Sequence, residues 1–145
     1  MIKNCPLCQT PLHQTVLVEN LPAYSCPTCA GIWISAVEYL AWRAPHPFVL
    51  PEALDIEQAF ELPYPMTDNR QALFCPDCGR FLRRFEIWPN VAFHLDRCST
   101  CTGIWFDQNE WHTLQVQDLH YHLNLFFSPV WQAKLKDEEM RQRFV

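Results

Sequence analysis

Two stretches of the chain show the pattern of apolar and polar positions that is typical of a half-buried β-strand. Residues 80–87 alternate between polar and apolar side chains, and residues 12–18 form a similar strand-like run. A turn follows each stretch, at 20–22 and at 88–90, and a second strand-like run comes next, at 23–25 and 91–97. The pattern therefore predicts two β-hairpins, one in each half of the chain.

A short helix is predicted directly after each hairpin. Ser35 followed by Glu38 forms a capping box, so a helix begins there, and it must end before Pro45. Asp107 and Glu110 stand at the equivalent positions of the second half and predict a helix through residue 114. Capping explains both glutamates, so we do not assign them as catalytic acids.

The segment between the two halves is rich in proline and reads as a linker. Within residues 45–74, the stretch 51–60 begins with proline and has acidic residues in its first turn, which predicts a short helix. The stretch 62–65 has two prolines and is expected to be extended.

The chain continues beyond the second predicted helix with a strongly apolar segment. Leu119, Leu123, Phe126 and Phe127 fall at helical spacing, and Tyr121 and Leu125 lie off that face. A final helix is expected from Ser128-Pro129 to about residue 143, with Asp137/Arg141 and Glu139/Arg143 at the spacing that supports an exposed helix.

A helix that is apolar nearly all round is normally buried, and two small units offer little surface for it. Two explanations stay open. In the first, the linker helix with Leu54, Ile56 and Phe60 folds back and covers the second side. In the second, the segment is a docking surface for another copy of this chain or for another protein, formed by Leu119, Leu123, Phe126, Phe127 and Trp131.

Cysteine spacing gives the chemistry of the chain. The two halves read C-x2-C-x17-C-x2-C and C-x2-C-x19-C-x2-C, both near the spacing of a four-cysteine zinc site, and no cysteine is left over. We therefore predict two structural Zn2+ ions bound by Cys5, Cys8, Cys26, Cys29, Cys75, Cys78, Cys98 and Cys101. Iron remains an alternative, because the ligand type does not exclude it.

Length and composition fit this interpretation. In a chain of 145 residues, the repeat predicts a first ribbon at 1–44, a linker at 45–74, a second ribbon at 75–117 and a C-terminal extension at 118–145. Units this small usually need a metal or disulfide staple. With no signal-peptide pattern and no apolar run long enough to span a membrane, we expect a cytoplasmic protein whose thiols stay reduced.

Charge argues against a general nucleic-acid binder. The formal net charge is −5, and eight thiolates with two zinc ions make it −9. Basic residues with neighbouring aromatic side chains gather in one hairpin only, at Arg80, Arg83, Arg84 and Arg97. Acidic residues dilute that hairpin, so nucleic acid is an alternative partner and a solvated hairpin face is the preferred interpretation.

Two other kinds of residue have both a functional and a structural interpretation. Trp33 and Trp105 could stack on bases, but each is better explained as the ring that seals a small core. His120 and His122 could suggest a third metal. Residues two apart on a helix face different ways, which disfavours it.

The repeated segments resemble the prokaryotic family of transcription factor IIB-like zinc ribbons. The resemblance rests on the four cysteines of each half with Gly31, Trp33 and Glu38, and with Gly103, Trp105, Asp107 and Glu110. The sequence departs from the family pattern at Gln9, Ala30 and Thr102, where glycine is usual, so these residues are expected near positive φ. The resemblance implies a fold and does not imply a role in transcription.

The predicted fold class is a small, metal-stabilised α+β protein. It has two tandem zinc ribbons followed by the helical extension. Each ribbon is a β-hairpin with a C-x-x-C turn, called a knuckle, at each end, plus a short helix. No nucleophile–base pair or open metal site is visible, so the chain is not expected to be an enzyme. We expect a protein-interaction adaptor, assembly factor or regulator; the alternative is a nucleic-acid-associated factor that uses the arginine hairpin and whose binding depends steeply on salt.

Overall fold

Both predicted hairpins form. In the computed structural model, which describes residues 2–46, 54–67 and 69–143, strands β1 (His13–Leu17) and β2 (Leu21–Ser25) pair antiparallel across the 3-10 segment η1 (Val18–Asn20). Strands β4 (Leu82–Glu86) and β5 (His94–Cys98) pair in the same way in the second half. The strands begin and end within a few residues of the predicted bounds. The alternation of side chains predicted the strands, and the turn residues predicted where they end.

Two further strands were not predicted, and they join the halves. Strands β3 (Ile32–Ile34) and β6 (Ile104–Phe106) follow the second knuckle of each half and pair antiparallel with each other. The result is one six-stranded sheet in the order β1-β2-β3-β6-β5-β4. Trp33 lies directly opposite Trp105, its own equivalent in the repeat, so the two ribbons are related by an approximate two-fold axis at that pair.

The sheet separates two clusters of buried side chains. Side chains alternate between the faces of a strand, so Ile32 and Ile34 lie on the face opposite to Trp33. The first face carries the larger cluster, which includes residues of all four helices. The second face carries Trp33, Trp105 and buried cysteines of both halves. The sheet therefore lies between the helices and the knuckles.

Helices α1 (Ala36–Arg43) and α2 (Glu110–Gln115) occupy equivalent places but begin differently. Ser35 caps α1 as predicted, because its hydroxyl accepts a hydrogen bond from the amide of Glu38 at 3.3 Å. Asp107 does not cap α2, which begins after Asn109 in the left-handed conformation. Only the reverse half of the predicted capping box is present, since the Asp107 amide donates to the Glu110 carboxylate at 2.6 Å.

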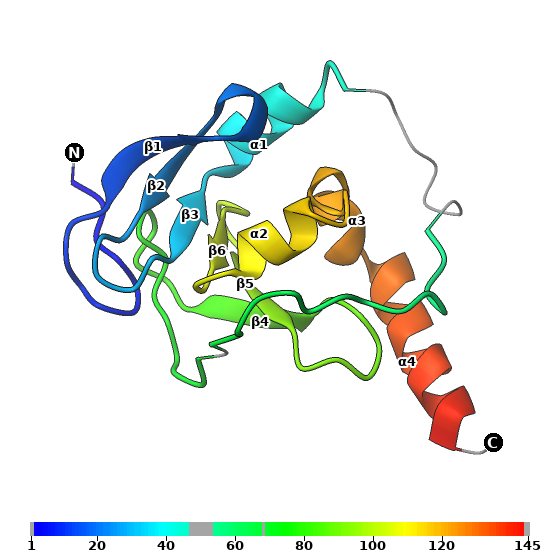
Figure 1. The fold of residues 1–145 in the computed structure, drawn as a ribbon. Coiled ribbons are helices and arrows are strands. Elements are labelled where there is room, and N and C mark those ends of the chain that lie inside the picture. Colours follow the sequence, from blue (N-terminus) through cyan, green and yellow to red (C-terminus); the bar gives the residue numbers. More distant parts are fainter. Residues whose placement is uncertain (1, 47–53, 68, 144–145) are drawn as a thin grey trace.

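The C-terminal extension is broken rather than one helix. Segment η3 (His120–His122) leads into the single turn α3 (Leu123–Phe126), and α4 (Pro129–Arg143) begins after Ser128, whose hydroxyl accepts from the Trp131 amide at 3.2 Å. Helix α4 leaves the body of the molecule at its C-terminal end (Figure 1). Arg141 pairs with Glu57 and Glu138 rather than with the predicted Asp137.

The extension side chains that were considered for docking lie in the core. The expectation of an exposed apolar surface is therefore corrected: the exposed fraction is 8% or less for all of Leu119, Leu123, Phe126, Phe127 and Trp131. They pack against the sheet, where Phe127 meets Phe85 edge to face and the Trp131 indole donates to the carbonyl of Ile87 at 2.9 Å. The sequence underestimated the available surface because it did not predict that the two ribbons share one sheet.

The linker contributes to this core without forming the predicted helix over its described part. Residues 54–60 form turns, in which the Asp55 carboxylate accepts from the Glu57 amide at 3.0 Å; residues 51–53 lie outside the described residues. This local hydrogen bond offers the backbone an alternative to a helix. Leu54, Ile56 and Phe60 still pack on the core that contains the extension, and the Phe60 ring contacts Trp88 and Phe93. The linker therefore folds back onto the core as the first explanation expected, but as turns and not as a helix.

Candidate metal centres

Four knuckles of the same construction hold the eight cysteines. In each, the residue after the second cysteine donates its amide to the carbonyl of the first, and the pairs are Gln9–Cys5 (2.8 Å), Ala30–Cys26, Gly79–Cys75 and Thr102–Cys98 (2.9 Å each). The donor residue has positive φ every time, from 61° to 70°. Gln9, Ala30 and Thr102 therefore adopt the left-handed conformation that was predicted where this chain lacks glycine.

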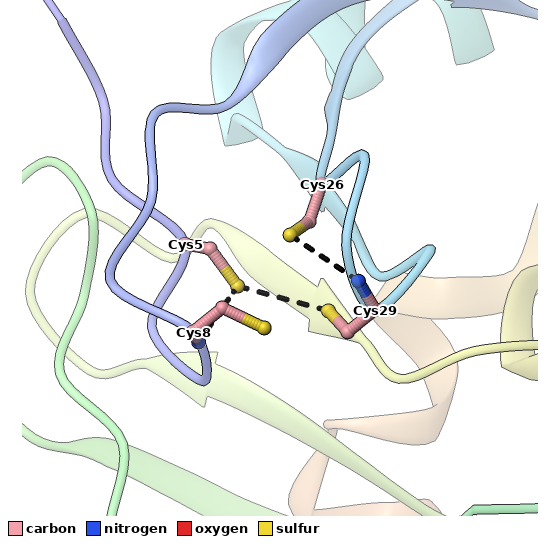
Figure 2. Close-up of side chains that lie close together, drawn as sticks. All are labelled: Cys5, Cys8, Cys26 and Cys29. Carbon is pink, nitrogen blue, oxygen red and sulfur yellow. Dashed lines mark hydrogen bonds between the residues drawn. The ribbon is translucent and has the colours of Figure 1, made fainter.

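The knuckles bring the sulfur atoms together in two groups of four. Within each group, all ligand atoms lie within 4.8 Å of one another. The sulfurs of Cys5 and Cys29 are 3.8 Å apart, and those of Cys75 and Cys101 are 3.6 Å apart (Figure 2 shows the first site). A tetrahedral zinc ion with Zn–S bonds of about 2.3 Å requires sulfurs about 3.8 Å apart. The geometry and the donor set therefore both fit a structural zinc ion in each site.

Backbone amides point at the sulfurs and favour their thiolate forms. The Cys8 amide donates to the sulfur of Cys5, and the Cys78 amide donates to that of Cys75, both at 3.2 Å. Burial raises the pKa of the Cys5 thiol to about 11. At Cys26 burial also acts to raise the pKa, but the amide of Cys29 and the hydroxyl of Thr10 outweigh it and lower the value to about 6.

The two sites are connected through the tryptophans. A Cβ atom added at Gly103 would lie 2.4 Å from the Trp33 ring, and one added at Gly31 would lie 2.2 Å from the Trp105 ring. Each indole thus occupies the space left by the glycine of the other ribbon. Both tryptophans are fully buried core rings, as predicted, and β3 and β6 place them in one shared cluster.

Polar contacts on the knuckle face also cross between the ribbons. The Trp33 indole donates to the Asp77 carboxylate at 3.2 Å, and Lys3 forms an ion pair with the same carboxylate. In the second ribbon, Trp105 donates to Asp107 at 2.9 Å, and the Asn69 amide group reaches the same carboxylate at 2.5 Å. Asp107 and Asn69 were not identified as a pair in the sequence, where nothing links residues that far apart.

The structure separates the four arginines of the predicted basic cluster. Arg84 pairs with Asp96 at 3.3 Å, and Arg80 lies in a zinc knuckle, where its carbonyl accepts from the Cys75 amide. Arg83 and Arg97 lie directly opposite each other on β4 and β5, on the other face from Arg84. The cluster therefore does not form one continuous basic surface.

His120 lies in the aromatic core and not in a metal centre. The imidazole of His120 packs between Trp42 and Trp111, with ring centroids 5.9 and 5.4 Å away. Among the described residues, the two four-cysteine groups are the clusters that could hold a metal ion. No helix in the described ranges is long and apolar enough to cross a bilayer.

Two four-cysteine sites on knuckled hairpins define a tandem zinc-ribbon protein. The model of the transcription factor zinc-finger family, the TFIIB-type zinc ribbon, matches residues 4–45 and 74–115, more than half of the chain, so the chain belongs to that family. No curated protein and no solved structure matches the chain in the comparisons made.

Proposed function

We propose that the chain is a non-catalytic adaptor, assembly factor or regulator that binds another protein through an exposed aromatic surface beside its knuckles. Four thiolates complete the tetrahedral coordination of zinc and leave no position for substrate, so the metals act by holding the platform rigid. The shared sheet extends this rigidity across both ribbons.

An exposed aromatic pair beside the knuckles carries the proposal. Phe74 and Phe81 are 50% and 62% exposed, yet their rings pack together with centroids 4.4 Å apart. Phe74 also lines a groove of about 350 Å³ between the first knuckles of the two ribbons, together with Ile2 and Pro76. Exposed aromatic groups held on a rigid frame are typical anchors of protein interfaces.

The test is capture of partners from a nuclease-treated lysate by the immobilised, zinc-loaded chain. The double variant Phe74→Ser/Phe81→Ser should lose the captured proteins. The double variant Val37→Ser/Val116→Ser removes exposed apolar side chains elsewhere and should retain them. Both variants must keep two zinc ions. Equal capture by the two variants would contradict the proposed face.

The nucleic-acid alternative is supported by the family name and by the arginines of the second hairpin. It predicts binding that falls steeply with salt and weakens when these arginines are removed. Capture that persists between about 0.1 M and about 1 M salt favours the protein partner. Capture that nuclease abolishes favours the alternative.

A further inference from the structure

Arg83 and Arg97 form a like-charged pair across two strands. The two residues are directly opposite each other in the β4–β5 register, so their side chains leave the same face from neighbouring positions. Like charges in this arrangement normally destabilise a sheet. Neither guanidinium has an ion-pair partner among the described residues.

Aromatic rings hold both guanidinium groups in place. Arg83 lies over the Phe85 ring at 4.6 Å, and Arg97 lies over the Phe127 ring at 5.1 Å. The two rings pack edge to face, with centroids 5.0 Å apart and planes at 77°. Both rings are buried, so each guanidinium lies over a ring that the core holds in place.

The first ribbon provides an internal comparison. The residues at the same register positions of β1 and β2 are His13 and Ser25, and the position equivalent to Phe85 is Thr15. The zinc-ribbon frame therefore does not require a pair of arginines there, nor the rings beneath them. The pair belongs to the second ribbon alone, where the extension supplies Phe127.

We propose that Arg83 and Arg97 bind a single compact oxyanion group, either a phosphate monoester or a carboxylate. Two adjacent guanidinium forks can donate several charge-assisted hydrogen bonds to one such group. The bound anion also removes the repulsion between the two cations. Phe81 lies two residues before Arg83, but the proposal rests on neither Phe74 nor Phe81.

The face favours a compact anion over a nucleic-acid backbone. A strand of phosphates needs a row of cations, whereas only two of the four arginines share this face. The net charge of −5 adds a general repulsion that grows with the number of charges on the ligand. A ligand with one localised charge centre is therefore repelled least by the net charge of the protein.

The test is a titration of the zinc-loaded chain with inorganic phosphate, and separately with O-phosphoserine and with succinate. Chloride keeps the ionic strength constant, and the Nε–H signals of the arginines are followed by NMR. Saturable shifts at Arg83 and Arg97 are expected. Arg83→Gln and Arg97→Gln should each weaken binding about tenfold or more, since each removes charge-assisted hydrogen bonds.

Arg80→Gln is the matched control, because it removes the same charge from an exposed arginine outside the pair. It should change the affinity less than about twofold. If Arg97→Gln loses zinc or unfolds, Arg97→Lys replaces it, since it keeps the charge and removes the fork. Shifts with phosphate or O-phosphoserine alone assign a phosphate site, and shifts with succinate alone assign a carboxylate site.

Three results would overturn the proposal. The first is an absence of saturable shifts at Arg83 and Arg97 with all three anions. The second is equal weakening by Arg80→Gln. The third is binding of a short oligothymidylate that is tighter than phosphate and that depends on Arg80 as well as on the pair, because it would indicate a polyanion site.

Discussion

The two ribbons share one zinc frame and differ in almost everything attached to it. Both have two knuckles with the same turn geometry, a four-sulfur site and a central tryptophan. Helix α1 has eight residues and a serine cap, whereas α2 has six and begins after a left-handed asparagine. The comparison shows that zinc coordination constrains the knuckles and the hairpin between them, while the helices and other side chains differ between the two ribbons.

The extension explains much of the divergence. It packs on the second ribbon, where Phe127 contacts Phe85 and Trp131 contacts Trp88 with centroids 5.4 Å apart. It also reaches the first ribbon through His120, whose backbone carbonyl accepts from the Tyr39 hydroxyl at 2.8 Å. The extension therefore completes a core that both ribbons share, since Leu21, Ile34 and Tyr39 of the first ribbon lie in the same cluster.

The largest expected effect tests whether the two ribbons are independent. Cys98→Ser should abolish zinc binding in the second site, where coordination contributes about 10–16 kcal/mol to folding. Because Trp33 packs on Gly103, the first ribbon should lose order too. Zinc content and the NMR signals of residues 5–29 provide the measurement. A native first ribbon with one bound zinc would show that the halves fold separately.

The next effect tests the attachment of the extension. Trp131→Ala should reduce the free energy of unfolding by about 3–5 kcal/mol, because it removes a ring that is 1% exposed together with its hydrogen bond to Ile87. Val130→Ala, one residue away and 67% exposed, should have little effect. Denaturation of both zinc-loaded variants gives the comparison. If the two variants were equally stable, the extension would not belong to the core.

A smaller effect examines the contact between the ribbons. Gly103→Ala places a Cβ against the Trp33 ring, and such overpacking should cost about 1–3 kcal/mol. The control is Gly79→Ala, where φ is +70° and no atom lies within 4 Å, so only the backbone strain of about 1 kcal/mol applies. Chemical denaturation measures the free energy of unfolding of both variants. A larger loss of stability for Gly79→Ala would contradict the close packing of Trp33 on Gly103.

The smallest effect concerns the histidine between the two halves. Burial lowers the pKa of His120 to about 4, from 6.5, against the smaller effects of Asp118 and Glu19, which raise it. As pH falls, the unfolded chain takes up the proton first. The contribution of neutral His120 to the free energy of unfolding is therefore complete above pH 6.5 and is lost progressively toward pH 4.

Replacing His120 with Phe should remove this dependence. The stability lost between about pH 8 and about pH 5.5 should be about 1 kcal/mol smaller in the variant than in the parent chain. Denaturation curves at both pH values, with zinc content checked at each, provide the measurement. Equal losses in the two proteins would mean that other groups, including the zinc ligands, account for the whole pH effect.

The sequence by itself determined the features that depend on local spacing and side-chain chemistry. Cysteine spacing identified both metal sites, because two turns joined by a hairpin can bring four sulfurs together without help from the rest of the chain. Alternation located the hairpins, and Ser35 with Glu38 located α1. The positive φ of Gln9, Ala30 and Thr102 was expected from the resemblance to the family, whose pattern has glycine at these positions.

Only the tertiary structure decided how the local units combine. Strands β3 and β6 have three residues each, too few for periodicity to reveal, and their pairing creates the six-stranded sheet. That sheet provides the surface that buries the apolar side chains of the extension, for which the sequence predicted no certain cover: Leu119, Leu123, Phe126, Phe127 and Trp131. It also divides the four arginines between a pair on one face, a salt bridge on the other and a knuckle. These outcomes depend on contacts between residues far apart in the chain, and no local pattern encodes them.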